Sequence, residues 1–130
     1  MIFLDTSAIY ALASESDANH AAAKRIFDAI LASGEPLLTH NYILVESFAL
    51  ISRRLGWQSA AAFANEARHF AVEWIDAETH DAAVMQWIVY KPSVSFVDQV
   101  SFLIMKRLGI GEAFAFDDDF TSAGFRLVVE

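Results

Sequence analysis

The sequence contains no cysteine, which excludes disulfide bonds, thiolate zinc sites and cysteine nucleophiles. Any catalytic or metal-binding side chain must therefore offer oxygen or imidazole. The sequence also lacks an uncharged apolar run of the roughly 18 to 20 residues that a membrane span needs. No basic segment with a small-residue cleavage site precedes the first apolar residues. We therefore expect a soluble, cytoplasmic protein with no membrane partner.

Basic residues are few. The chain has 9 Lys and Arg against 17 Asp and Glu, and its formal net charge is −8. This is the wrong sign for a protein that holds nucleic acid by its overall field. With 130 residues, 55% of them hydrophobic, the chain can bury one substantial core but is short for two. We expect one domain that spans residues 1–130.

Short apolar segments alternate with longer segments of helical pattern. The segments that predict strands are 1–4, 37–39, 72–75, 113–116 and 127–129. The segments that predict helices are 6–12, 19–32, 41–55, 58–70, 79–90 and 96–108, with a break at Pro92-Ser93. Gly34 and Gly56 are placed to end two of these helices. Apolar strands separated by helices are typical of an α/β domain with a parallel sheet.

Two acidic residues follow predicted strands. Asp5 ends the first apolar run, and Asp117 ends the run 113–116. In open parallel sheets, ligands bind in the crevice beyond the carboxyl ends of the strands. An unpaired carboxylate removed from water costs several kcal/mol. Such a group therefore needs a partner, and a hard divalent cation suits a cluster of carboxylates.

Two more acidic residues lie in predicted helices. Glu46 is surrounded by apolar residues on nearly every side of its helix, which leaves it little prospect of a solvated face. Asp98 begins another helix, but Ser95 three residues earlier also fits a simple capping box. Asp5 equally fits a helix cap, and the run Asp117 to Asp119 is also typical of a solvated turn. A shared metal site accounts for all four acids at once, whereas local roles in caps and turns would have to arise independently.

The acids and their flanking residues resemble the successive motifs of PIN-domain ribonucleases. The matching segments are Met-Ile-Phe-Leu-Asp-Thr-Ser at 1–7, Thr-His-Asn-Tyr-Ile-Leu-Val-Glu at 39–46, Ser-Phe-Val-Asp-Gln-Val-Ser-Phe at 95–102 with Lys-Arg-Leu-Gly-Ile at 106–110, and Phe-Asp-Asp-Asp-Phe at 116–120. They occur in order over nearly the whole chain. The chain is most similar to the small stand-alone PIN proteins that act as VapC-type toxins.

The resemblance implies a three-layer α/β/α sandwich whose mainly parallel five-stranded sheet has the order 3-2-1-4-5. It also implies endonucleolytic cleavage of RNA that depends on Mg²⁺ or Mn²⁺, as the toxin of a toxin–antitoxin pair. By matching position, the acidic quartet is Asp5, Glu46, Asp98 and Asp117, and the supporting hydroxyls are Thr6 and Ser95. Ala115 stands where relatives often carry Thr or Ser. The acidic run leaves open whether Asp119 shares or replaces the role of Asp117.

We expect Asp5 and Asp98 to bind metal directly, and Glu46 and Asp117 to hold metal or orient water. Hydrolysis by water would leave a 5′-phosphate and a 3′-hydroxyl, whereas attack by the neighbouring 2′-hydroxyl would leave a cyclic phosphate and needs fewer acids. Candidate phosphate contacts are the paired basic residues at helix ends, although these also suit the helix dipole: Arg53, Arg54, Lys106 and Arg107.

The four histidines show no metal-ligand spacing, and we interpret each as a surface or core polar residue. Two apolar helix faces exceed what one small core absorbs, which predicts a homodimer. These faces comprise Val84, Met85, Trp87 and Ile88, and Ile9, Leu12, Ile26 and Ile30. The resemblance adds an antitoxin that covers a helix-lined groove. The alternative hypothesis is a non-catalytic PIN-fold binding module that acts through protein or RNA partners.

Overall fold

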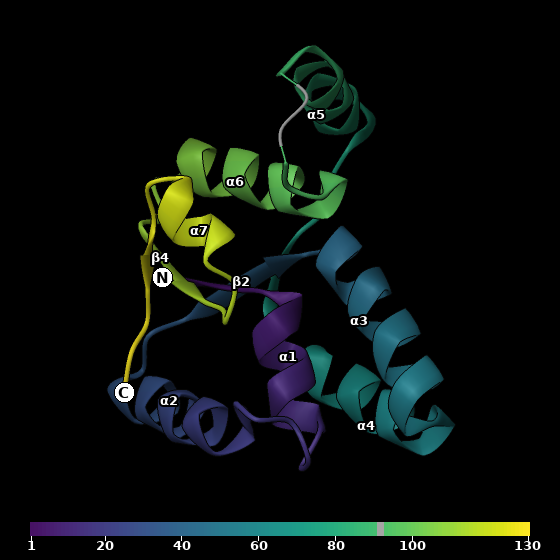
Figure 1. Cartoon of the computed structure of the whole chain (residues 1–130), viewed down its shortest axis with the longest axis vertical. Coiled ribbons are helices and arrows are strands. Elements are labelled where there is room, and N and C mark those ends of the chain that lie inside the picture. Colours follow the sequence, from purple (N-terminus) through teal and green to yellow (C-terminus); the bar gives the residue numbers. More distant parts are fainter. Residues whose placement is uncertain (91–92) are drawn as a thin grey trace.

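Five parallel strands form one sheet with β1 at its centre, in the order β3-β2-β1-β4-β5. The computed structural model describes residues 1–90 and 93–130 (Figure 1). The strands are β1 (Ile2–Leu4), β2 (Leu37–His40), β3 (Ala71–Glu73), β4 (Glu112–Phe114) and β5 (Arg126–Leu127). The predicted strand order and parallel sheet are confirmed.

Helices cover both faces of this sheet. They are α1 (Thr6–Ala13), α2 (His20–Ser33), α3 (Asn41–Leu55), α4 (Trp57–Ala67), α5 (Ala77–Tyr90), α6 (Phe96–Leu108) and α7 (Asp119–Ser122). Figure 1 shows α6 and α7 on one side of the sheet, α1 and α2 on the other, and α5 beyond α6. The layers form the predicted α/β/α sandwich. Within the described ranges, no helix is long and apolar enough to cross a bilayer.

The core lies between the sheet and the helices because the central strands are apolar on both faces. Phe3, Leu4 and Phe114 are fully buried. Ile26 and Ile30 place the apolar stripe of α2 against this core. These two residues and Ile9 are buried within the chain itself, so the predicted partner face that included them is wrong.

Several predicted boundaries differ by a few residues, and the difference at β4 matters most. The strand ends at Phe114, whose carbonyl accepts a hydrogen bond from the Asp5 amide at 3.1 Å. The Phe116 amide then donates to the Ser7 side chain at 2.9 Å, which takes the chain out of the sheet. Asp117 therefore lies in the loop after β4 and does not end the strand, which corrects the prediction.

Other boundaries shift less. Helix α4 ends at Ala67, before the predicted residue 70, and β3 begins at Ala71. Strand β5 begins at Arg126, one residue before the predicted start. The predicted bounds of α3 and α6 are confirmed. Of the predicted break before α6, Pro92 lies outside the described residues.

The short helix α7 was not predicted. Its Phe120 side chain is fully buried, and its ring lies 5.1 Å from that of Phe102 and 6.1 Å from that of Phe3. Phe120 directly follows the run Asp117 to Asp119, which is typical of a solvated turn. Its burial fixes the position of Asp119, the first residue of α7.

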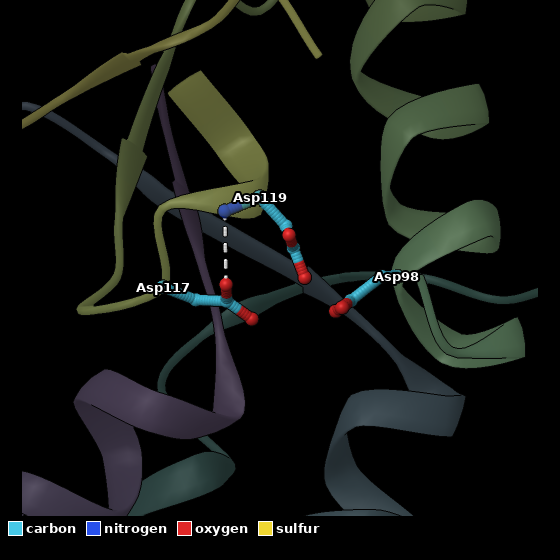
Figure 2. Close-up of side chains that lie close together, drawn as sticks. All are labelled: Asp98, Asp117 and Asp119. Carbon is cyan, nitrogen blue, oxygen red and sulfur yellow. Dashed lines mark hydrogen bonds between the residues drawn. The ribbon is translucent and has the colours of Figure 1, made fainter. Parts of the chain in front are cut away.

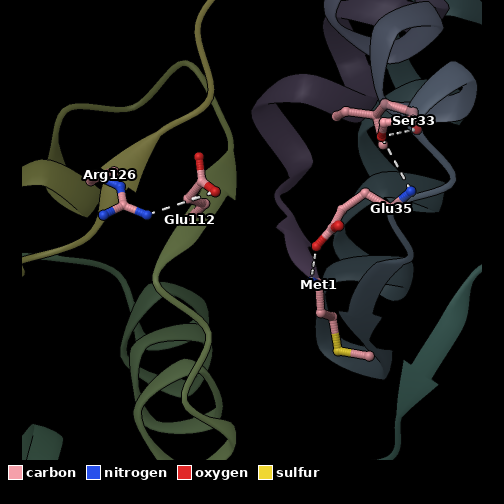
Figure 3. Close-up of polar contacts among 6 residues, drawn as sticks. Met1, Ser33, Glu35, Glu112 and Arg126 are labelled. Atoms are coloured by element: carbon pink, nitrogen blue, oxygen red, sulfur yellow. Dashed lines mark hydrogen bonds and ion pairs between the residues drawn. The ribbon is translucent and has the colours of Figure 1, made fainter.

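Exposed polar contacts connect neighbouring strands of the sheet near their first residues (Figure 3). The Met1 ammonium group pairs with Glu35, and the Ser33 hydroxyl accepts a hydrogen bond from the Glu35 amide at 3.2 Å. Arg126 of β5 lies 3.7 Å from the Glu112 carboxylate of β4. These pairs are solvated and each contributes little to stability.

Candidate metal-binding active site

The site lies where the order of the sheet reverses. From β1 the chain builds β2 and β3 on one side and then β4 and β5 on the other. The crevice at the carboxyl ends of β1 and β4 is therefore a topological switch point, which is where such sheets bind ligands. Asp5 directly follows β1, and Asp117 and Asp119 follow β4.

Three carboxylates from two distant parts of the chain meet at this crevice. Asp98, Asp117 and Asp119 each offer an oxygen, and these oxygens lie within 4.8 Å of one another (Figure 2). Asp98 comes from the first turn of α6, and the other two come from the β4–α7 segment. An Asp117 carboxylate oxygen accepts a hydrogen bond from the Asp119 amide at 2.9 Å, which fixes one acid relative to the other. One cation can therefore contact a carboxylate oxygen of each of the three residues.

Asp5 is the most deeply buried acid of the site, with 4% of its surface exposed. It caps α1, and its Oδ2 atom accepts hydrogen bonds from the Ser7 amide at 3.1 Å and the Ser7 hydroxyl at 2.6 Å. Burial raises the pKa of Asp5 to about 6, although both bonds from Ser7 lower it. The negative charges of Glu46 and Asp117 raise this pKa further.

Asp98 experiences the summed charge of the cluster. Burial raises the pKa of its carboxyl to about 7, and the charges of Asp5, Asp117 and Glu46 add to the effect. The charge of Asp117 likewise raises the pKa of Asp119. The charge of Glu46 raises the pKa of both Asp5 and Asp98. Of the predicted quartet, the structure places Asp98 and Asp117 in the close group of oxygens, together with Asp119, whereas Asp5 and Glu46 lie outside that group.

The surroundings of Glu46 differ from those expected. Val45 is 64% exposed, Ala49 is also exposed, and Glu46 itself is half-buried. Helix α3 thus has a solvated side, and the prediction of an apolar residue shell around Glu46 is wrong. Helix α3 nevertheless starts directly after β2 at the same edge of the sheet as the crevice, and the charge of Glu46 raises the pKa of Asp5 and Asp98.

Ser7 is a site residue that the sequence patterns did not single out. Its hydroxyl donates to Asp5 and accepts from the Phe116 amide, so it ties the first acid to the loop that carries Asp117. The signal was present, because a serine two residues after a capping Asp can donate to the cap. Thr6, the expected supporting hydroxyl, is buried and accepts a 3.5 Å hydrogen bond from Ser47.

Ser95 lies where the capping pattern places it. Its hydroxyl accepts a hydrogen bond from the Asp98 amide at 3.1 Å and so caps α6. Helix capping and a role in the site are therefore compatible in this segment, because the cap orients the turn from which the Asp98 carboxylate projects.

The candidate basic residues lie far from the acids along their helices. Lys106 and Arg107 are in the last turn of α6, about 12 to 14 Å along the axis from Asp98. Arg107 donates a 2.9 Å hydrogen bond to the Thr79 hydroxyl of α5. In the last turn of α3, the Arg54 guanidinium lies 5.5 Å from the centre of the Tyr10 ring, and Arg53 is exposed.

A divalent cation fits this donor set. In the described part of the chain, the ion pairs are Met1 with Glu35, Arg25 with Glu130, and Arg126 with Glu112, so none neutralises an acid of the crevice. The site offers carboxylate oxygens, which Mg²⁺ and Mn²⁺ prefer over the softer ligands that other metals select.

Comparison with known proteins gives the family of this fold and site. The family model described as PIN domain matches residues 2–126. The chain belongs to the PIN domain family. A curated relative from Mycobacterium tuberculosis, the 23S rRNA-specific endonuclease VapC20, is 40% identical over 130 residues, which cover 96% of this chain and 95% of the relative.

Solved structures agree with this membership. The crystal structure of M. tuberculosis VapC20, described as a Sarcin-Ricin loop cleaving toxin, has a TM-score of 0.86 at 39% identity and full coverage of both chains. FitAcB from Neisseria gonorrhoeae has a TM-score of 0.67 at 13% identity, covering 98% of this chain and 96% of that one. PAE2754 from Pyrobaculum aerophilum has a TM-score of 0.58 at 18% identity, covering 98% and 88%. The last two share the PIN fold.

The raised pKa values of this PIN domain predict that the metal-free protein loses stability as pH rises from about 4 to 7. Asp5 and Asp98 bind protons more tightly in the folded chain than in the unfolded one, so their stabilising protonation is lost through pH values of about 6 and about 7. We expect the thermal midpoint without metal to be lower at pH 8 than at pH 5. Mg²⁺ should raise it at pH 8.

The variant Asp5→Asn isolates this effect. Removal of the buried charge should stabilise the metal-free protein at pH 8 by on the order of 1 to 3 kcal/mol, measured by urea unfolding. Asp118→Asn is the matched control, because Asp118 is exposed and makes no side-chain capping bond. A wild type equally stable at both pH values without metal would contradict the electrostatic account.

Proposed function

We propose that this protein is an endoribonuclease that hydrolyses RNA phosphodiester bonds with Mg²⁺ or Mn²⁺, and that it is the toxin of a toxin–antitoxin pair. The observation that carries the proposal is the convergence of oxygens of Asp98, Asp117 and Asp119 within 4.8 Å of one another, beside the buried Asp5, with no ion pair to these acids among the described residues. A relative of nearly the same length, 40% identical, is named as an rRNA endonuclease. An RNA substrate implies that the protein works in the cytoplasm.

The substrate that we infer is RNA of the large ribosomal subunit. The support is the relative named as specific for 23S rRNA and the matching structure described as cleaving the Sarcin-Ricin loop. A structured loop also suits an open crevice, because the half-buried acids Asp98, Asp117 and Asp119 are reachable by a phosphate of an exposed strand.

The acids divide into two roles in this proposal. Asp5 and Asp98 bind the cation directly, while Glu46 and Asp117 hold it or orient the attacking water. Asp119 shares the position of Asp117, since its carboxylate lies in the same group of oxygens. When bound, the divalent ion activates water and stabilises the charge that develops on the phosphate and the departing oxygen.

The chain's own residues prepare this chemistry. Ser7 holds the Asp5 carboxylate through two hydrogen bonds, and Ser95 fixes the helical turn of Asp98. Since the pKa values of Asp5 and Asp98 are raised to about 6 and about 7 without metal, protonation of both competes with cation binding at low pH. Cleavage at subsaturating Mg²⁺ should therefore increase from about pH 5.5 to about pH 8.

Incubation of purified protein with ribosomal RNA and with unstructured RNA tests the activity. We expect discrete cuts with 5′-phosphate and 3′-hydroxyl ends in Mg²⁺ or Mn²⁺, and none with chelator. Asp98→Asn should lower the rate by at least about a hundredfold, equivalent to roughly 3 kcal/mol of transition-state stabilisation. Asp118→Asn should cleave at nearly the wild-type rate.

Two outcomes would contradict this function. Cleavage that persists in Asp98→Asn or in chelator would exclude the acid cluster as the active site. A folded wild type that cuts no RNA in either metal, yet binds RNA or protein, would favour the non-catalytic binding module.

We also propose that the antitoxin occupies a groove between α1, α2 and α4. The groove has a volume of about 440 Å³. Its floor is apolar, and charged residues lie at its rim. The floor includes Leu12, Phe27, Phe63 and Phe70, and the rim includes Lys24, Asp28 and Glu66. This pattern is typical of a site for an amphipathic helix.

The variant Ala62→Arg tests this groove. Ala62 is an exposed residue of α4 that lines it, so an arginine there would fill the groove without disturbing the core. We expect the variant to cleave RNA normally but to escape inhibition by the cognate antitoxin, whose binding weakens at least about tenfold, or about 1.4 kcal/mol. Unchanged inhibition of the variant by the antitoxin would exclude this groove as the antitoxin-binding site.

The second partner that we propose is another copy of the chain. Helix α5 buries only Thr79 and Ala83 within the described part of the protein. Its last two turns expose several large apolar side chains, and exposed apolar patches of this kind mark interaction sites. These are Met85 at 60%, Ile88 at 56%, Val89 at 64% and Tyr90 at 76% exposure.

Light scattering tests the dimer. We expect a mass of about twice 14.4 kDa at micromolar concentration. Ile88→Glu should give monomers, because a charge in a buried apolar interface is unpaired. Leu31→Glu is the matched control, since Leu31 is a similarly exposed aliphatic residue on α2. A wild type that remains monomeric would contradict the proposal.

A further inference from the structure

A fully buried histidine lies between the elements that carry two of the acids. His40 is the last residue of β2 and has no exposed surface. Its Nδ1 atom accepts a hydrogen bond of 3.4 Å from the Ile43 amide and so caps α3. Its Nε2 atom lies 2.9 Å from the Ser101 hydroxyl of α6. Both ring nitrogens therefore have partners in the interior.

The hydrogen-bond pattern selects one tautomer. Because Nδ1 accepts from a backbone amide, the ring proton is on Nε2 and is donated to the Ser101 oxygen. Ser101 in turn donates to the Val97 carbonyl at 3.0 Å. Burial lowers the pKa of His40 to about 3, so the ring stays neutral at working pH. In the hydrogen bond between His40 and Ser101, Nε2 is therefore always the donor and the Ser101 oxygen is the acceptor.

This link joins the two helices whose acids oppose each other. Helix α3 carries Glu46, and Ser101 lies one turn after Asp98 on α6. The charge of Glu46 raises the pKa of Asp98, so the two carboxylates repel when both are ionised. The hydrogen bond between His40 and Ser101 joins the starts of the two helices, and it therefore opposes the repulsion between these carboxylates. The rings of Tyr42 and Phe96, 6.2 Å apart, extend the same contact.

We propose that His40 is a positioning residue that holds the start of α6 against the start of α3, and so keeps Asp98 in the group with Asp117 and Asp119 that binds one divalent cation. The inference rests on the proposed metal site and assigns to it a support that lies outside the acids themselves. Removal of a direct hydrogen-bond partner of a metal ligand typically weakens metal binding by about 10- to 100-fold, and His40 acts on Asp98 through Ser101 one helical turn away, so we expect the lower end of this range. A residue that only packed the core would lower stability without a selective effect on metal binding.

Three substitutions separate the link, which is the hydrogen bond from His40 to Ser101, from the cap, which is the hydrogen bond from the Ile43 amide to His40. Ser101→Ala removes the link and leaves the cap. His40→Asn offers an amide oxygen near the position of Nδ1 and keeps the cap, but it does not reach Ser101. His40→Gln offers an amide nitrogen near the position of Nε2 and keeps the link, but it loses the cap. Ser14→Ala is the control, because Ser14 is a buried serine that contacts Ser16 at the far end of α1.

Mn²⁺ binding, measured by calorimetry on the folded proteins, is the primary readout. We expect Ser101→Ala and His40→Asn to weaken Mn²⁺ binding about tenfold, and His40→Gln and Ser14→Ala to remain within about twofold of wild type. In RNA cleavage at subsaturating metal, the link-breaking variants should lower kcat/KM for RNA, and a saturating metal concentration should restore most of the loss.

The outcomes distinguish this inference from the function on which it rests. If wild type binds Mn²⁺ and folded Ser101→Ala binds it equally well, the positioning role is overturned and the proposed nuclease stands. If wild type binds no Mn²⁺, the metal site and the positioning role are both overturned. Should either His40 variant fail to fold, Ser101→Ala against Ser14→Ala still decides the question.

Discussion

Repulsion among carboxylates that form no ion pair within residues 1–90 and 93–130 is the constraint on which this structure depends. Asp5 and Asp98 have pKa values raised to about 6 and about 7 because folding brings them out of water and next to other negative charges. A domain of this size has a stability of only about 5 to 15 kcal/mol, so such a cluster consumes a substantial share of it. The surrounding hydrogen bonds, from Ser7 to Asp5 and from the Asp98 amide to Ser95, act against this strain.

The topology explains why the acids meet at all. Strands β1 and β4 are neighbours in the sheet although they lie more than a hundred residues apart, and their carboxyl ends open at the same switch point. Short strands that are buried on both faces leave little freedom in register, because a slip would displace Phe3 and Phe114 from the core. The apolar core thus determines the geometry of the polar site, and the site needs no covalent cross-link to maintain it.

Sequence patterns predicted most of the architecture and the identity of the acids, but not their local supports. Helices α3 and α6 were predictable because apolar periodicity and glycine stops are local signals. The family resemblance supplied the strand order. Asp5 and Asp98 followed from their positions at the ends of elements. Helix α7 was missed because one buried aromatic, Phe120, overrides an acidic turn pattern. The link from His40 to Ser101 joins residues 61 positions apart, and no spacing rule relates them. Glu46 was selected for an apolar surrounding that exposed Val45 contradicts, so its position at the crevice comes from the edge at which α3 begins.

Because acidic residues outnumber basic ones in this chain, the cation has a second role in the proposed reaction. With a net charge of −8, the long-range field does not attract RNA, and the crevice itself repels phosphate while its carboxylates are unpaired. The candidate basic residues Lys106 and Arg107 do not offset this locally, because they lie about 12 to 14 Å along α6 from Asp98. Neutralisation of the crevice is therefore a condition for phosphate approach as well as for hydrolysis. It follows that RNA affinity and metal affinity are coupled at this site, and that supports such as the His40 link affect the substrate only through the acids that they hold in place.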